Sequence, residues 1–392
     1  MKGSELHEEV MQSCILVVDD IKLSREIISH FLIQAGFENI HFAVDGLDAL
    51  KKVDKYKPDL LILDIFMPNM NGFEVCKWLR AEEEFKDTPV MIQTAMAETE
   101  NRAKAFASGA TDLLPKPVTP FELTAKVNMH LENSVILNGL KKYHNRLRRD
   151  LEVAKNMQSA LMPPDEILKK ARENFALKID QKYESSDELG GDFWGMDILD
   201  EERVFVYIVD FAGHGVSAAL NTFRFHSVMA QYKYITDPAK HLEKLNKILF
   251  ELLPVEQYAT MFCGIIDLKN DKLTYSAAAS TAPIIGKKGS EEIELLDPSG
   301  FPLGMIKDAT YETREVPFLK GEGLFLYSDV LTESIDQTGK MIGDEGFEAM
   351  CRDSFLHMGE RMGFLDRFLK IFDMHVVRPL TDDLTAVIIQ RQ

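Results

Sequence analysis

The sequence predicts two domains of different fold class, a doubly wound α/β domain and an α+β domain, with a helical connector between them. Residues 14–130 alternate short apolar runs with amphipathic helical patterns, which indicates a parallel sheet covered by helices on both faces. Residues 120–162 read as almost uninterrupted helix, and beyond residue 175 strand patterns surround longer helical patterns. We therefore expect a tail, an α/β domain, a connector and an α+β domain at 1–12, 13–130, 131–163 and 164–392.

Composition and charge limit what the chain can bind. Its 392 residues include 45 Lys and Arg against 63 Asp and Glu, and the resulting net charge of −18 disfavours nucleic acid and anionic membranes as partners. The four cysteines form no CxxC pair, and the charged start is unlike a signal peptide. No uncharged run approaches the roughly 18 residues of a membrane span. We expect a cytoplasmic protein with no membrane or nucleic-acid partner.

Five polar residues follow the apolar runs of the first domain. They are Asp19, Asp20, Asp64, Thr94 and Lys116. Because the carboxyl ends of parallel strands share one edge of a sheet, these side chains should lie together. Clustered carboxylates repel one another unless a hard cation such as Mg²⁺ neutralises them. Asp64 would be the nucleophile in phosphoryl transfer, while Lys116 and Thr94 would contact the phosphoryl oxygens.

The first domain resembles the CheY-like receiver domain of bacterial response regulators, with a flavodoxin-like fold. The matching segments are VVDD, LILDIFMPNMNG, QTAM and LLPKP. The resemblance implies that Asp64 is the phospho-acceptor. It also implies that Asp20, Asp64 and the Phe66 carbonyl ligate Mg²⁺, with Asp19 acting through water. Receivers usually have Tyr or Phe three residues before the lysine as a rotating switch, and this chain has Leu113 there.

The connector shows an imperfect heptad pattern, which favours pairing with a second helix over a solvated spacer. Its positions are Leu140, His144, Leu147, Leu151, Ala154, Gln158 and Leu161. Pro163 and Pro164 end the helical pattern. We expect a homodimer formed through this helix, the receiver, or both.

Carboxylates also end or open several strand patterns of the second domain. These are Asp192, Asp210, Asp329, Asp382 and Asp383. Separated carboxylates at strand ends suit a two-metal site that activates water for attack on phosphate, and hard oxygen ligands favour Mn²⁺ or Mg²⁺. His214 lies in the glycine turn after Asp210, and a histidine there is more often a packing or capping residue than a ligand. We therefore expect His214 and Gly213 to support the metal ligands without binding the metal.

The motif GGDFW (190–194) invites comparison with the GGDEF motif of diguanylate cyclases. That motif needs an acidic residue where Phe193 stands, and the rest of the cyclase pattern is missing. A transcription factor is disfavoured as well, because the C-terminal end has no basic recognition helix.

Residues 150–392 resemble the metal-dependent PPM Ser/Thr phosphatases, specifically the RsbU/SpoIIE-like branch, with an antiparallel β-sandwich flanked by helices. The segments that match are DLEVAKNMQSALMP, LGGDFW, DFAGHGVSAAL, SDVLTE and DDLT. The resemblance implies that Asp210 bridges two metals and that the Phe211 carbonyl, Asp329 and Asp382 ligate one of them. Asp192 would complete the other metal's shell, and Asp383 would lie behind the ligands.

Two departures separate the chain from this family pattern. Val330 replaces the glycine of SDG and would be strained if the position required a positive φ, and AASTAP (278–283) replaces AGHxP. Neither removes a ligand, so we expect an active enzyme. The alternative is a degenerate phosphatase fold that binds and sequesters a partner under control of phosphorylation.

The two resemblances together imply a response regulator whose output is protein dephosphorylation. A sensor histidine kinase or phosphotransfer protein would phosphorylate Asp64, and the substrate would be a phosphorylated STAS-type anti-sigma antagonist. The connector would transmit the change between the domains.

Overall fold

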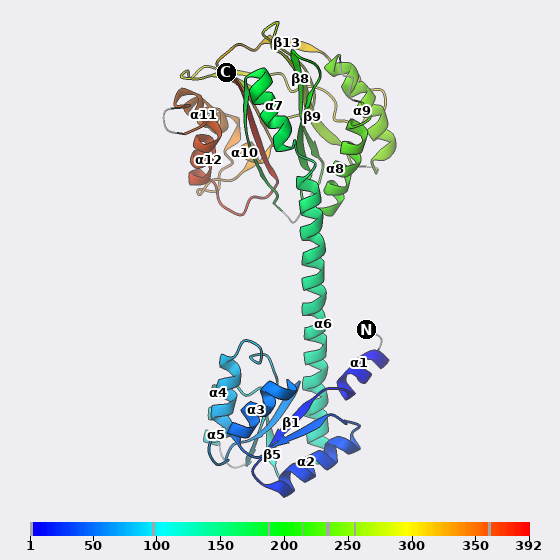
Figure 1. The fold of residues 1–392 in the computed structure, drawn as a ribbon, viewed down its shortest axis with the longest axis vertical. Helices are drawn as coiled ribbons and strands as arrows, with labels where there is room; N and C mark the ends of the chain where they lie inside the picture. Colours follow the sequence, from blue (N-terminus) through cyan, green and yellow to red (C-terminus); the bar gives the residue numbers. More distant parts are fainter. Residues whose placement is uncertain are drawn as a thin grey trace. The chain divides into compact units, whose positions relative to one another are not determined.

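The fold was analysed in a computed structural model, which describes residues 3–392 apart from 96–98, 187–188, 214, 233–235, 255 and 360–361. The chain divides into two units, 1–147 and 148–392, and the division falls inside the predicted connector (Figure 1). None of the described helices is long and apolar enough to cross a membrane.

The first unit is built on a five-stranded parallel sheet with the order β2-β1-β3-β4-β5. Its strands are β1 (Ile15–Val18), β2 (Ile40–Ala43), β3 (Leu60–Asp64), β4 (Val90–Ala95) and β5 (Asp112–Lys116). Its helices are α1 (Gly3–Met11), α2 (Lys22–Gln34), α3 (Gly46–Tyr56), α4 (Gly72–Ala81), α5 (Thr99–Ala107) and the first part of α6 (Pro120–Ser159). Local sequence sets several helix starts; Asn71 and Glu74, for example, form a capping box at α4.

Two apolar clusters fill the two faces of this sheet, so the predicted doubly wound fold is confirmed. Residues of α3, α4 and α5 contribute to one cluster, and residues of α1, α2 and α6 contribute to the other. Helix α1 lies within the residues expected to form a tail, and its Val10 is 1% exposed in the second cluster. Leu123, Val127 and Leu131 anchor α6 in the same cluster.

The second unit contains two five-stranded antiparallel sheets, β13-β10-β9-β8-β7 and β12-β11-β14-β15-β6. The first sheet consists of β7 (Asp192–Ile198), β8 (Arg203–Phe211), β9 (Ala259–Asp267), β10 (Lys272–Ala278) and β13 (Arg314–Pro317). The second consists of β6 (Leu177–Glu184), β11 (Ile284–Lys287), β12 (Ile293–Leu295), β14 (Glu322–Tyr327) and β15 (Leu384–Arg391).

Helices cover both outer faces of this sandwich (Figure 1). On these faces lie α8 (Val216–Met229), α9 (Pro238–Leu252), α10 (Val330–Glu333), α11 (Gly343–Leu356) and α12 (Phe364–His375). Helix α7 (Asp165–Phe175) instead packs through Ala171 and Phe175 against the cluster between the sheets. Strand β8 has an almost continuous apolar sequence because both of its faces are buried. Phe205 and Tyr207 face the cluster under α8 and α9, while Val204 and Val206 face the cluster between the sheets. The predicted α+β sandwich is confirmed.

Candidate functional site

Three aspartates meet at the carboxyl edge of the parallel sheet. One carboxylate oxygen from each of Asp19, Asp20 and Asp64 lies within 4.8 Å of the others. They meet because β1 and β3 are neighbouring parallel strands whose ends are in register. Asp19 and Asp64 are buried and Asp20 is exposed. Three close carboxylate oxygens with one open side fit a hard cation such as Mg²⁺.

Lys116, which ends β5, reaches the same cluster. Its Nζ lies 2.8 Å from Oδ1 of Asp64 and 3.4 Å from Oδ2 of Asp19. Burial raises the pKa of Asp64, and the hydrogen bond and charge of Lys116 oppose that shift. Burial acts to lower the pKa of Lys116, but its bonds to Asp64 leave it raised overall, so the ammonium stays charged. A fixed positive charge thus stands beside the predicted phospho-acceptor.

The other predicted residues of this edge occupy different settings. Thr94 is buried near the end of β4, and Leu113 is buried in the cluster under α3 and α4. The Phe66 side chain is 68% exposed, so only its backbone could contribute to the site. Ser24, which the sequence reasoning missed, donates a 2.6 Å hydrogen bond to Oδ2 of Asp19. In the sequence, Ser24 is marked only weakly, as a hydroxyl residue in the first turn of α2.

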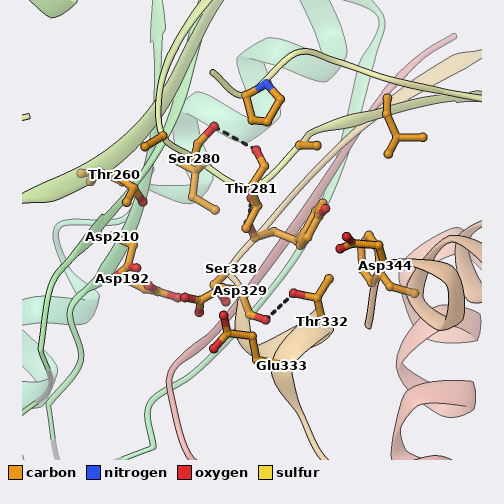
Figure 2. Close-up of a pocket in the computed structure, with 18 of the residues that line it drawn as sticks. Asp192, Asp210, Thr260, Ser280, Thr281, Ser328, Asp329, Thr332, Glu333 and Asp344 are labelled. Carbon is orange, nitrogen blue, oxygen red and sulfur yellow. Dashed lines mark hydrogen bonds between the residues drawn. The ribbon is translucent and has the colours of Figure 1, made fainter. Parts of the chain in front are cut away.

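The second unit brings four carboxylates from two sheets to one end of the sandwich. Asp192 and Asp210 are directly opposite in the β7–β8 pair. Asp329 follows β14, and Asp382 precedes β15 in the other sheet. Asp192, Asp210 and Asp329 line a cavity of about 460 Å³ (Figure 2). Asp382 acts electrostatically on both Asp210 and Asp329, so it belongs to the same group.

These carboxylates have unusually high pKa values because burial and their mutual repulsion disfavour the charged forms. Burial, followed by the charges of Asp329 and Asp382, raises the pKa of Asp210 to about 7. Burial, followed by Glu333 and Asp382, raises the pKa of Asp329 to about 6. Burial and Asp210 raise the pKa of Asp192 well above its usual range. No lysine, arginine or histidine is among the described residues that line the cavity.

The donor set fits divalent metals such as Mn²⁺ and Mg²⁺, which prefer oxygen ligands. Oδ2 of Asp192 is buried and lacks a hydrogen-bond partner among the described residues. An ideal Cβ on Gly191 would lie 2.9 Å from the carbonyl oxygen of Phe211, so this carbonyl stands next to the loop that leads into Asp192. In the part of the chain that is described, Asp19, Asp20 and Asp64 of the first unit are the only group of carboxylates with one oxygen each within 4.8 Å of the others. Metal ligation here would need side-chain adjustment or bridging water.

Asp383 holds the glycine loop in front of Asp192. It is 2% exposed, and its carboxylate accepts hydrogen bonds from the Ser186 amide at 2.8 Å and the Gly191 amide at 2.6 Å. A Cβ on Gly190 would lie 2.4 Å from Oδ2 of Asp383, which explains why this position is glycine. The neighbouring Asp382 is exposed. These two adjacent aspartates therefore have different surroundings.

The structure also describes both departures from the phosphatase pattern. Val330 opens α10 and is 1% exposed in the cluster under α11 and α12. Its φ is not positive, so the strain that a glycine requirement would impose is absent. Ala279, in the AASTAP segment, does have a left-handed backbone with φ of 54°. Gly213 has φ of 95°, and His214 lies outside the described residues.

Sequence reasoning assigned Gln158 to the heptad seam and missed its contacts in the second unit. Gln158 is 2% exposed. Its Nε2 donates to the Gly190 carbonyl at 2.6 Å, and its Oε1 accepts from the Gly190 amide at 3.1 Å. The signal was an amide at an apolar heptad position. Sequence reasoning also missed Glu333 and Asp344, which line the cavity (Figure 2).

Comparison with known proteins agrees with this division. Residues 15–128 match the model of the response regulator receiver domain, and residues 200–392 match the model of stage II sporulation protein E (SpoIIE). Transcriptional regulatory protein YvrH of Bacillus subtilis is 37% identical over 120 residues, which are 31% of this chain and 49% of YvrH. The alkaline phosphatase synthesis regulator PhoP of the same organism is 37% identical over 126 residues, 32% of this chain and 51% of PhoP.

The chain therefore spans about half the length of the curated relatives it matches. Among solved structures, the SiaA-PP2C domain of Pseudomonas aeruginosa aligns with a TM-score of 0.56 and 21% identity, covering 64% of this chain and 99% of that one. This likeness establishes the fold of the second unit. Residues 15–128 therefore match the family of response regulator receiver domains, and residues 200–392 match the SpoIIE family.

Proposed function

We propose that phosphorylation of Asp64 controls a metal-dependent phosphoserine and phosphothreonine phosphatase in the second unit. The observation that most supports this proposal is the group of carboxylates around the cavity of the second unit. These carboxylates have raised pKa values, and no cationic side chain is among the described residues that line the cavity. A site of this kind needs divalent cations to hold a phosphoryl group.

In the receiver, an oxygen of Asp64 would attack the phosphorus of a phosphohistidine. The new O–P bond forms as the P–N bond breaks, and the imidazole leaves. Asp19, Asp20, Asp64 and the Phe66 carbonyl would hold Mg²⁺ beside this reaction. Lys116, already 2.8 Å from Asp64, would neutralise the phosphoryl oxygens, and Thr94 would donate a hydrogen bond to them. The phosphodonor would be a sensor histidine kinase or a phosphotransfer protein.

In the second unit, Asp210 would bridge two Mn²⁺ or Mg²⁺ ions. The Phe211 carbonyl, Asp329 and Asp382 would ligate one ion, and Asp192 would complete the shell of the other. Such ions lower the pKa of water and neutralise charge on phosphoryl oxygens. Water would attack phosphorus in line, and the P–O bond to the serine or threonine would break. Asp383, with its oxygens bonded to Ser186 and Gly191, would stay behind the ligands with Gly213 and His214.

The connector gives this proposal a physical route. The first turns of α6 pack in the receiver core, and Gln158 near its end bonds the loop that leads into Asp192. Between these ends, Ile136, Leu140 and Leu147 are 44–62% exposed, which suits pairing with a second copy. If light scattering shows a monomer at micromolar concentration, the predicted homodimer is wrong.

By family resemblance, the substrate would be a phosphorylated STAS-type anti-sigma antagonist. Dephosphorylation of such a protein would couple a histidine kinase to partner-switching control of transcription. A candidate phospho-STAS protein should therefore lose phosphate when incubated with this chain and Mn²⁺, and failure with every candidate would exclude this substrate class.

The enzymatic activity itself has a direct test. With Mn²⁺, the purified chain should hydrolyse p-nitrophenyl phosphate, and Asp210→Asn should reduce the rate at least a hundredfold. Asp200→Asn, at an exposed aspartate paired with Arg203, is the matched control and should keep wild-type turnover. Wild-type protein without metal-dependent turnover would favour the degenerate, partner-binding alternative.

A further inference from the structure

Asp192 and the paired strands β6 and β15 contain three buried polar atoms that lack hydrogen-bond partners among the described residues. Within the described residues, Oδ2 of Asp192, the hydroxyl of Tyr183 and Oγ1 of Thr385 are all buried and unpaired. Asp192 is 3% exposed and Thr385 is fully buried. Tyr183 and Thr385 are directly opposite in the β6–β15 pair, so their side chains project from the same face of the sheet.

Independent observations place both hydroxyls close to Asp192. A Cβ on Gly190 would lie 2.4 Å from the Tyr183 hydroxyl, so this hydroxyl touches the loop that leads into Asp192. Burial, then the charges of Asp383 and Asp192, raise the pKa of Tyr183. The Thr385 hydroxyl lies near enough to Asp192 to act to lower the pKa of that carboxyl, against the larger effects of burial and Asp210, although no hydrogen bond of normal geometry joins the two.

The three atoms complement one another chemically. Each hydroxyl can donate a hydrogen bond, and a carboxylate oxygen can accept two. Asp383 has less capacity for them, because its Oδ1 already accepts twice from Ser186 and its Oδ2 accepts once from Gly191. An unpaired buried hydroxyl is destabilising, so native proteins seldom leave several of them close together.

We propose that Tyr183 and Thr385 are positioning residues for Asp192. Their hydroxyls hold its inner oxygen Oδ2, directly or through one water, so that its other oxygen faces Asp210 and the metal site. The inference rests on the proposed function, since orienting Asp192 matters because it would ligate a metal. Groups behind a metal ligand orient it and typically change metal affinity by about 10–100-fold when removed.

The test compares conservative variants that remove one hydroxyl each. Tyr183→Phe and Thr385→Val should each weaken Mn²⁺ binding by about tenfold, measured by titration calorimetry on the full chain. Thr385→Ser, which keeps the hydroxyl, should retain most of the affinity. The melting temperature of each variant in EDTA is the folding control, because a loss of Mn²⁺ affinity counts only where the variant remains folded.

Tyr311→Phe is the matched control. Its hydroxyl is also buried and unpaired among the described residues, but its pKa is raised by burial and by Glu243 on α9, not by the site carboxylates. This variant should bind Mn²⁺ like the wild type. Affinities within twofold of wild type in both Tyr183→Phe and Thr385→Val, with wild-type turnover intact, would overturn the inference alone. A wild-type chain that binds no Mn²⁺ and has no turnover would overturn the proposed function as well.

Discussion

Aspartate has three different environments in this chain, and its neighbours determine what each can do. Asp64 lies beside the ammonium of Lys116, which places a positive charge next to the predicted phospho-acceptor. Asp210 is buried among other carboxylates, and burial together with their charges raises its pKa to about 7. Asp383 accepts backbone hydrogen bonds and fixes a loop. Residue type alone does not distinguish these roles.

The pH dependence of stability follows from the raised pKa values of Asp210 and Asp329, about 7 and about 6. Unfolded aspartate titrates near pH 3.9. The folded state therefore binds these protons more tightly, and the resulting stability is complete below about pH 4 and is lost as pH rises through 6 to 7. In EDTA, the melting temperature of wild type should fall between pH 5 and pH 8 relative to Asp210→Asn, by at least about 2–4 °C.

Mn²⁺ should reverse this loss, because the metal binds the deprotonated carboxylates. The rise in melting temperature on adding Mn²⁺ should thus be larger at pH 8 than at pH 6. Wild type and Asp210→Asn with parallel pH profiles in EDTA would contradict the assignment of the raised pKa.

Val330 gives a second prediction at the residue scale. Because its side chain is buried and its backbone is not left-handed, restoring the glycine of the family pattern should destabilise the domain. The loss of a buried side chain and the added freedom of glycine should together cost about 2–3 kcal/mol. Urea unfolding measures this difference, and a more stable Val330→Gly variant would show that valine is strained there.

At the scale of elements, α6 changes its environment along its length. Its first turns belong to the receiver core, and its middle exposes an apolar stripe that includes Ile136 and Leu140. Gln158 lies near its end and is buried against Gly190. The predicted heptad seam therefore cannot pair along its full length, because Gln158 is already engaged. Pairing of the exposed part stays a prediction.

Gln158→Leu should reduce phosphatase turnover. The substitution leaves the buried N–H and C=O of Gly190 without partners, each at a cost of about 1–3 kcal/mol, so the loop before Asp192 should shift. We expect Mn²⁺-dependent hydrolysis of p-nitrophenyl phosphate to fall by about tenfold or more. The control is Asn156→Leu at an exposed position of the same helix; equal rates in both variants would argue against a role for the Gln158 contact.

At the scale of the whole molecule, one continuous helix, α6, joins a domain that matches the receiver family to a domain that matches the SpoIIE family. Phosphorylation adds charge beside Lys116, which now bridges Asp64 and Asp19. A rearrangement of that contact can bias the helix, and the helix contacts the loop that leads into Asp192. Control of the second site by the first is thus physically reasonable.

Beryllofluoride, which mimics an aspartyl phosphate, should change Mn²⁺-dependent turnover of the wild-type chain at least twofold when Mg²⁺ is present. Asp64→Asn should not respond. Asp54→Asn, at an exposed position of α3, should respond like the wild type. A response that is the same in wild type and Asp64→Asn would exclude regulation through this aspartate.

Much of the fold and part of the site could be predicted because the relevant signals are local. The apolar runs that end at Asp19 and Asp64 mark buried parallel strands, and parallel strands place their carboxyl ends along one edge. Lys116 ends β5, which β4 separates from β3, and its long side chain spans this gap to reach Asp64. The two fold classes followed from the same periodicity and were confirmed.

Other features depend on the tertiary structure. Asp383 differs from Asp382 because Ser186 and Gly191 reach only the former. Tyr183 and Thr385 meet through the register of two strands far apart in sequence. Gln158 bonds Gly190, 32 residues away, across loops that no local pattern describes. The sequence by itself determined the two fold classes and the chemical types of the residues that end the strands at both sites. Only the packing of distant segments decided which side chains share a site, because sheet register and loop path depend on contacts that short patterns do not encode.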